Sequence, residues 1–415
     1  MFERCCGVDV HRDTLVATIR IATDKQVSTQ NRTFATYADG IEELSRWLDK
    51  HSVEAVMMEA TGVYFQPLVH ALRRLSPHRL VSVANPSAVK QIPGRKTDVS
   101  DSAWLAKLLM NGVVSPSFIP SEQLEELRKL SRYRAKKVGV KNATKNRIIK
   151  LVESEGIKLA TVLSDVLGKS GRAMLQALVD GGQSAEQMAE LAQGSLRHKK
   201  AELVRALSNP VNETTLWILR QLLDDLTQEE ARIAQVEAEL SRRLQASYSR
   251  EMALLQTIPG IAEVIAATIV AETGADMSVF PSAAHLASWA GLAPGNHQSA
   301  GKSRKAPVRP GNPWLRTALV QAAHVLARKR DSPLRAFFLR VLHNSANYNK
   351  AIIAVARKLA VTVYYALRDG EVRWPEPTEI SGSQQARLKQ QLVTRLETLG
   401  YSVSLAKKDP GPTVS

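Results

Sequence analysis

The hydrophobic pattern of the first 115 residues changes from short strands to alternating helices and strands. Three apolar stretches separated by polar turns predict a three-stranded meander, at residues 5–10, 15–21 and 27–34. The spacing then predicts a helix at 37–51, a strand at 54–59, a helix at 65–75, a strand at 79–84 and a helix that begins near Ser100. A meander followed by alternating helices and strands predicts a mixed α/β sheet.

Long helical periods dominate the middle of the chain. Residues 121–155 carry apolar side chains at helical spacing and predict one long helix. Residues 213–248 predict a second long helix, which we expect to pair with the first as an antiparallel coiled coil, either within the chain or between subunits. Between them, residues 157–210 predict shorter helices that break at Gly168, Gly171, Gly181, Gly182 and Gly194.

Beyond residue 250 the pattern predicts helices joined by one tight turn and one long loop. Pro259 and Gly260 predict the tight turn, and the helix after it runs through Glu272. Residues 291–312 are rich in glycine, proline and cations and predict the loop. Two apolar helices are expected after it, at 314–327 and 348–367.

These changes of pattern divide the chain into four segments. They are an α/β domain at 1–115, a helical coiled-coil region at 116–250, a mostly helical domain at 251–370 and a tail at 371–415. The tail predicts only a short helix near 384–399, and no function is assigned to it.

Composition adds a strong positive charge. Lysine and arginine exceed aspartate and glutamate by 56 to 40, which gives a net charge of +16 and an isoelectric point near 9.9. A polyanionic partner is therefore expected, and nucleic acid is the first candidate. A membrane surface is the alternative, but the sequence has no apolar run of about eighteen residues and no charged-then-apolar leader, so we expect a cytoplasmic protein. Cys5 and Cys6 are adjacent in a predicted buried strand, which leaves any metal to carboxylates.

Two acidic residues fall in the predicted strands. Asp9 lies in the first strand and Glu59 closes the fourth. An acidic side chain in a buried strand is costly unless it is paired or bound to a metal. The alternatives are a turn that joins Asp9 with His11 and Arg12, and a helix cap at Glu59.

A second pair of acids precedes the helix near residue 100. The segment 94–103 reads Gly-Arg-Lys-Thr-Asp-Val-Ser-Asp-Ser-Ala, with Asp98 and Asp101 three residues apart after Arg95 and Lys96. Mg²⁺ prefers oxygen ligands and keeps positions open for substrate, so this arrangement suits a divalent metal that holds a phosphate. The alternative is a helix cap. Because four acids from strands and a helix would meet the needs of a ribonuclease-H-like metal site, we predict that they converge.

The first long helix carries many cations and few acids after residue 130. A charge run is often only a solvated face, but such a helix would repel itself without a negatively charged partner. We therefore predict that it binds a nucleic-acid backbone. The side chains expected to do so are Arg132, Arg134, Lys136, Lys137, Lys141 and Lys145.

The C-terminal loop offers a nucleophile. Ser299 is flanked by small residues and followed by Lys302, which would let its hydroxyl approach a phosphorus closely. The alternative is a hydrogen-bonding turn residue, the commoner role of serine in such a loop. The Pro259-Gly260 turn has two interpretations as well, a backbone contact to phosphates or an ordinary helical hairpin.

Together these segments resemble a known family. The series Gly-Val-Asp-Val-His at 7–11, Met-Glu-Ala-Thr-Gly-Val-Tyr at 58–64, Asn-Pro at 85–86 and Gly-Arg-Lys-Thr-Asp-Val-Ser-Asp at 94–101 resembles the N-terminal RuvC-like domain of DEDD transposases of bacterial insertion sequences. The loop with its Ser-x-Gly-Lys pattern resembles the family's C-terminal transposase domain. The resemblance places the family's four acids on Asp9, Glu59, Asp98 and Asp101 and its serine nucleophile on Ser299, whereas Ser288 and Ser303 fit the pattern less well.

The resemblance implies a mechanism and partners. It implies DNA strand exchange through a serine–DNA covalent intermediate, assisted by Mg²⁺ or Mn²⁺ at the four acids and guided by a structured bridge RNA. The partners would be donor DNA, target DNA and that RNA, with a homodimer that assembles into a tetramer on DNA at the bacterial nucleoid. Further nucleic-acid contacts are expected from Arg95, Lys96, Lys302, Arg304, Lys305 and Arg309. The alternatives are a RuvC-type metal-dependent junction nuclease without a covalent intermediate, and a non-catalytic nucleic-acid scaffold.

Overall fold

The structure, a computed structural model, forms two compact units, Met1–Arg243 and Leu244–Ser415. It describes residues 2–23, 26–60, 62–86, 89, 92, 101–114, 117–294, 298–299, 302–303, 311–374 and 382–405, with the backbone alone described at 298–299, 302–303, 382–385, 387–388, 391 and 395. No helix among these described residues is both long enough and apolar enough to cross a bilayer.

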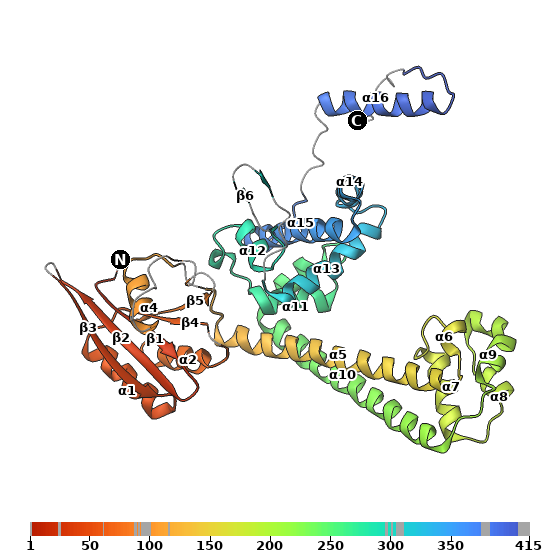
Figure 1. The fold of residues 1–415 in the computed structure, drawn as a ribbon, viewed down its shortest axis with the longest axis horizontal. Coiled ribbons are helices and arrows are strands. Elements are labelled where there is room, and N and C mark those ends of the chain that lie inside the picture. The colour runs from red at the N-terminus through yellow and green to blue at the C-terminus, as the bar shows by residue number, and fades with distance from the viewer. Residues whose placement is uncertain are drawn as a thin grey trace. The chain divides into compact units, whose positions relative to one another are not determined.

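The N-terminal domain is built on a five-stranded mixed sheet in the order β3-β2-β1-β4-β5 (Figure 1). The central strand β1 pairs antiparallel with β2 and parallel with β4. This arrangement confirms the predicted mixed sheet. The strands are β1 (Arg4–Val10), β2 (Thr14–Ala22), β3 (Val27–Ala35), β4 (Ala55–Glu59) and β5 (Leu80–Ala84).

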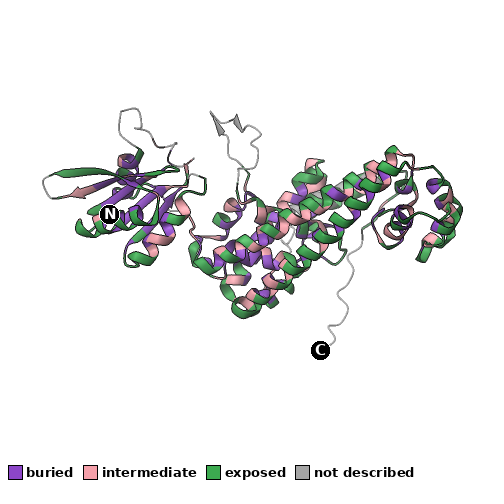
Figure 2. Ribbon diagram, turned by 90° about the horizontal axis from the view of Figure 1, so that it is seen from below, coloured by how far each residue is buried: buried purple, intermediate pink, exposed green. Residues whose placement is uncertain are grey.

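Helices cover both faces of this sheet. On one face, α1 (Ala38–Lys50) and α2 (Phe65–Leu75) share a core with Cys6 and Val8 of β1. On the other face, α4 (Asp101–Met110) shares a core with Cys5. The inner strands β1, β4 and β5 are accordingly buried along most of their length, whereas β3 at the edge is exposed (Figure 2). Alternation along β1 therefore assigns odd-numbered residues to the α4 face and even-numbered residues to the other.

Helix α4 lies directly on the backbone of β1. A Cβ atom on Gly7 would stand 2.0 Å from the Ser102 carbonyl oxygen and 2.4 Å from the Ala106 nitrogen. A buried hydrogen bond of 2.7 Å joins the hydroxyl oxygens of Ser102 and Thr18, the β2 residue opposite Gly7. Only glycine permits this approach, so the position of α4 depends on Gly7.

The two long predicted helices form an antiparallel pair within the chain. They are α5 (Glu122–Ser154) and α10 (Glu213–Gln256), and α10 bends at Tyr248, whose φ of −139° and ψ of 27° are not helical. The bend falls at the predicted end of the second helix. Three ion pairs join the helices in antiparallel order, Glu126 with Arg243, Arg134 with Glu237, and Lys137 with Glu229.

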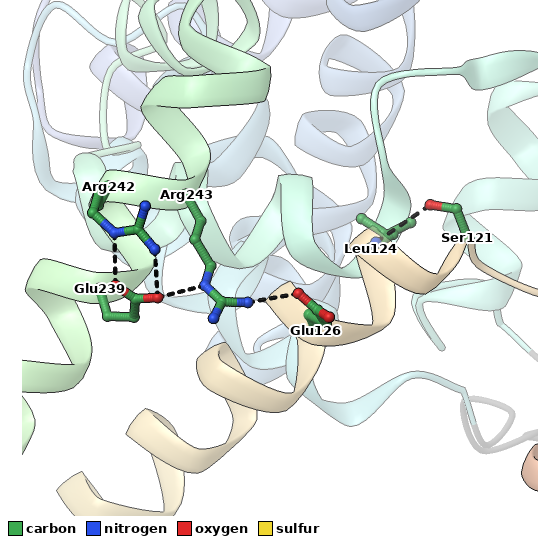
Figure 3. A network of polar contacts seen from close by, with 6 residues as sticks. All are labelled: Ser121, Leu124, Glu126, Glu239, Arg242 and Arg243. Carbon is green, nitrogen blue, oxygen red and sulfur yellow. Dashed lines mark hydrogen bonds and ion pairs between the residues drawn. The ribbon is translucent and has the colours of Figure 1, made fainter.

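One of these ion pairs belongs to a small network (Figure 3). Glu239 accepts hydrogen bonds from Arg242 and Arg243 of its own helix, and these lower the pKa of Glu239 to about 2. Arg243 Nη1 then donates across to Glu126 Oε2 at 2.6 Å. Ser121 caps the start of α5 by accepting a hydrogen bond from the Leu124 amide.

Short helices connect the C-terminal end of α5 to the N-terminal end of α10. They share a core with Ile148 of α5 and Leu219 of α10. The predicted break at Gly171 is wrong, because this residue lies inside α7, where a Cβ would stand 2.1 Å from the Val166 carbonyl oxygen. These elements are α6 (Leu159–Val162), α7 (Lys169–Asp180), α8 (Ala185–Ala189), η1 (Gly194–Lys199) and α9 (Lys200–Leu207).

The second unit packs its helices around α15, which contacts α12, α13 and α14. Buried small residues such as Ala356 and Ala322 let these helices approach closely. Helix α14 is an element that the sequence pattern did not predict. The elements are α11 (Glu263–Thr273), η2 (Met277–Val279), α12 (Ala283–Trp289), β6 (Gln298–Ser299), β7 (Lys302–Ser303), α13 (Pro313–Arg328), α14 (Arg335–Ser345), α15 (Tyr348–Asp369) and α16 (Gly382–Thr398).

Replacing Gly7 with alanine should lower the free energy of unfolding by about 1–3 kcal/mol, because the new methyl group meets backbone atoms of α4 that cannot turn aside. Urea denaturation followed by circular dichroism measures this. Gly139→Ala is the matched control, since nothing lies within 4 Å of a Cβ at that exposed position of α5. It should stabilise α5 by up to about 1 kcal/mol. A Gly7→Ala protein as stable as the parent would contradict the close approach.

The helix pair should lose stability in acid. Desolvation raises the pKa of Glu229, but hydrogen bonds from Lys137 and Arg232 outweigh it and lower the pKa overall, and Arg172 lowers the pKa of Glu230. Their contribution is therefore complete above the unfolded pKa of about 4.3 and is lost as the pH falls through the lower folded values. Unfolding measured from pH 6 to pH 3 should show a shallower pH dependence in Glu229→Gln/Glu230→Gln than in the parent chain. Parallel curves would refute the assignment.

Candidate active site

Asp9 lies one residue before the end of the central strand. It shares the α4 face of the sheet with Cys5 and Gly7, because the three residues alternate along β1. Its side chain is 26% exposed, and its Oδ2 lies 3.1 Å from Nε2 of His11. The strand assignment is therefore correct, and the alternative contact with His11 exists as well.

Glu59 lies beside Asp9 in the sheet. The parallel pairing of β1 and β4 brings Val8 opposite Met58, and Asp9 and Glu59 are the next residue on each strand. Met57 belongs to the core beneath α4, so alternation assigns Glu59 to the α4 face as well. The Glu59 residue is half-buried. Two carboxylate-bearing positions thus occupy the same edge of the sheet on the same face.

Asp101 is the first residue of α4 and is exposed. Its neighbour Ser102 is fixed by the hydrogen bond to Thr18 and by the contact with Gly7. Gly7 is two residues before Asp9 on β1. The start of α4 is therefore held over the part of the sheet that carries Asp9 and Glu59.

The remaining predicted residues of this face lie outside the described part of the chain, namely Asp98, Arg95 and Lys96. Among the described residues, no three His, Cys, Asp or Glu side chains stand close enough together to hold a metal. The structure thus brings Asp9, Glu59 and Asp101 to one face without assembling them into a ligand shell.

The donor types on this face suit a hard divalent cation. Asp9, Glu59 and Asp101 offer only carboxylate oxygens, the ligands that Mg²⁺ and Mn²⁺ prefer. The two cysteines are buried and free. Burial raises the pKa of Cys5 to about 11 and also raises that of Cys6, which keeps both as neutral thiols in the core.

The serine segment lies between α12 and α13. Its described backbone forms two short antiparallel strands that pair Ser299 with Lys302, where the sequence predicted an irregular loop. Three predicted phosphate contacts of this segment, Arg304, Lys305 and Arg309, lie outside the described residues.

The two ends of the serine segment are fastened together by residues that the sequence analysis did not select. The backbone N–H of Asn312 donates a hydrogen bond to the backbone carbonyl of Trp289 at 2.7 Å. A Cβ on Gly311 would stand 2.3 Å from the backbone nitrogen of Gly291, so the two chain segments are in close contact. Asn312 also caps α13 and donates through Nδ2 to Glu272 Oε2 at 2.6 Å. Glu272 is fully buried, and its signal in the sequence is a lone acid near the end of an apolar helix.

Contacts with α10 involve part of the basic run on α5. Arg134 and Lys137 pair with acids of α10, so their charge is compensated inside the coiled coil. The neighbouring helix thus supplies carboxylates for these two cations, and binding of a nucleic-acid backbone by α5 stays a prediction. Lys136 is exposed, and Arg132, Lys141 and Lys145 are half-buried, so these four stay predicted phosphate contacts.

Comparison with known proteins adds the identity of both domains. A family model of DEDD transposases of the IS110 type, described as "Transposase", matches residues 6–155, and the model described as "Transposase IS116/IS110/IS902 family" matches residues 252–339. The pilin gene-inverting protein of Moraxella bovis is 28% identical over 389 residues, covering 89% of this chain and 97% of that protein. A probable family 20 transposase of Pseudomonas aeruginosa is 26% identical over 308 residues, covering 74% of this chain and 81% of that protein.

Among solved structures, that of T. thermophilus RuvC in complex with a Holliday junction substrate aligns with 28% of this chain and 99% of its own, at 12% identity and a TM-score of 0.21. The two family models match the acidic domain and the domain of the serine segment in the order in which the sequence places them. The chain belongs to the IS110 family of DEDD transposases and is the transposase of an insertion sequence.

Proposed function

We propose that this transposase exchanges DNA strands through a covalent serine–DNA intermediate formed by Ser299 with help from the acidic face. The observation that carries the proposal is the placement of Asp9 and Glu59 side by side at the ends of parallel strands, with the start of α4 and Asp101 fixed over them. A divalent cation bound on this face would compensate the like charges of the acids. Mg²⁺ or Mn²⁺ bound there by Asp9, Glu59, Asp98 and Asp101 would polarise a phosphodiester and stabilise the leaving oxygen.

The residues of the chain then have distinct tasks. The hydroxyl oxygen of Ser299 forms a bond to phosphorus as its proton leaves, and one P–O ester bond breaks to release a deoxyribose hydroxyl. A hydroxyl of a second strand attacks the serine ester, forms a new phosphodiester and returns the hydroxyl to Ser299. One ester bond is exchanged for another at each step, so rejoining needs no nucleotide cofactor. Lys302, paired with Ser299 in the backbone of the hairpin, would hold the phosphate as a point charge.

The relatives support rejoining as well as cleavage. One of them is named for inverting a pilin gene, and an inversion requires that cut ends be joined in a new order. We propose that donor and target DNA are selected by a structured RNA of the element, as the family resemblance implies, and that a homodimer assembles into a tetramer on DNA. Base pairing by the RNA would leave the protein to bind backbones, which suits its net charge of +16.

Replacing Ser299 with alanine should abolish the covalent protein–DNA adduct and recombination, because no other group takes over the attack on phosphorus. The assay incubates the full chain with its element RNA, labelled donor and target DNA and Mg²⁺, and resolves adducts on a denaturing gel. Ser303→Ala in the opposite strand of the hairpin is the control and should keep the adduct. Cleavage that proceeds without an adduct in both the parent and Ser299→Ala would replace the serine mechanism with hydrolysis of the RuvC type. Omission of the RNA should prevent recombination.

Glu59→Gln and Asp101→Asn should each reduce strand cleavage by about 10²-fold or more while DNA binding persists, because a neutral amide is a poor ligand for Mg²⁺. Cleavage rate and filter binding are measured on the same preparations, with and without EDTA. Asp39→Asn is the matched control, since Asp39 is another exposed acid in the first turn of a helix. Equal effects of Asp101→Asn and Asp39→Asn would show that Asp101 only complements its helix dipole.

A further inference from the structure

The C-terminal half of α13 lines an open groove with a volume of ≈ 670 Å³. This volume lies within the range of ligand sites in proteins. Two of its lining residues are cations at the end of the helix, and a third, Val325, is an apolar side chain with 47% exposure. The lining residues are Gln321, His324, Val325, Arg328 and Lys329.

An exposed aromatic residue stands beside this groove. Tyr348, the first residue of α15, is 42% exposed, and its ring stacks on His324 with centroids 5.7 Å apart and an interplanar angle of 25°. Its hydroxyl lies 3.2 Å from His324 Nδ1. Phe338 packs against the Tyr348 ring in an edge-to-face arrangement, with the two ring centroids 5.6 Å apart. The pair of rings is therefore held in place before any ligand arrives.

The tight turn at Pro259-Gly260, which precedes α11, borders the groove on a further side. A Cβ on Gly260 would stand 2.8 Å from the Ala322 carbonyl oxygen and 3.2 Å from Val325 Cβ, at a φ of +87° that favours glycine. The turn is thus pressed against α13 next to the lining residues. Three separate segments of the chain meet at this groove.

The stretch of sequence that contains the lining residues is strongly basic. Between residues 301 and 368 the sequence holds fourteen lysines and arginines and a single acid, Asp331. This excess attracts a polyanion, and an open groove with aromatic side chains suits a strand whose bases are unpaired. A duplex keeps its bases stacked inside and would leave the rings of Tyr348 and His324 without a partner.

We propose that this groove binds an unpaired stretch of a DNA strand, with phosphates at Arg328 and Lys329, a base stacked against the Tyr348–His324 pair and the Gln321 amide at a base edge. We assign DNA as the ligand because the chain belongs to a transposase family. The groove lies along the half of α13 remote from Asn312, roughly 14–25 Å away at about 1.5 Å per helical residue. It is therefore separate from the anchor of the serine segment at Asn312, and loss of binding at the groove would leave the proposed strand-exchange chemistry intact.

Binding of a fluorescent 20-nucleotide single-stranded DNA to the full chain, measured by anisotropy across a salt series, tests the proposal. Arg328→Ala/Lys329→Ala should reduce the slope of log affinity against log salt by about 1.4, because two phosphate contacts are lost. Tyr348→Ala should weaken binding about tenfold or more, whereas Tyr348→Phe should retain it because stacking needs only the ring. Gln321→Glu, nearly unchanged in size, should weaken binding through repulsion of phosphate.

Arg357→Ala is the control for lost charge. Arg357 is exposed on α15 nine residues after Tyr348, which puts it on the opposite side of that helix. Thermal unfolding of each variant identifies any that fails to fold, and the surface changes at Gln321, Arg328 and Lys329 test the proposal independently of Tyr348. Losses no larger than that of Arg357→Ala, or equal losses for single-stranded and duplex DNA, would overturn the proposal. Tighter binding of a single-stranded RNA of the same sequence, lost in the same variants, would overturn the assignment to DNA.

Discussion

The contact between α4 and the central strand is the constraint on which the acidic domain depends. A helix can lie this close to a strand only where the strand has no side chain, and Gly7 supplies that position. The buried hydrogen bond between Ser102 and Thr18 then fixes the rotation of the helix as well as its distance. The start of α4 is thereby held against a strand that lies far from it in sequence, and the positions of the acids at the strand ends depend on this close packing.

The coiled coil shows the same dependence of charge on tertiary structure. Viewed alone, α5 carries cations that have few acidic neighbours along the helix. In the folded chain, Glu229 and Glu237 of α10 stand opposite Lys137 and Arg134. Electrostatic pairing between the helices accompanies their antiparallel alignment, and it leaves a smaller set of cations for nucleic acid than the sequence count suggests.

Local patterns in the sequence predicted most of the elements well. Short apolar stretches identified the strands that carry Asp9 and Glu59, and the helical period located α5 and the first part of α10. Convergence of the acids was not accessible in this way, because it depends on strand order and on the Gly7 contact. Asp98 and the side chain of Ser299 stay predictions. Glu272 was overlooked because its role appears only when Asn312, forty residues later, is placed beside it.

The fastening of Gly311 and Asn312 to Gly291 and Trp289 has a consequence for how this protein can evolve. When the ends of a segment are held by groups outside it, doubling its length costs only about 0.6 kcal/mol of closure entropy. Insertions and deletions between these anchor points are therefore nearly neutral for folding of the helical unit. Selection on the intervening sequence can therefore act on its chemistry alone. Substitutions at the anchor residues, in contrast, would lower the stability of the helical unit.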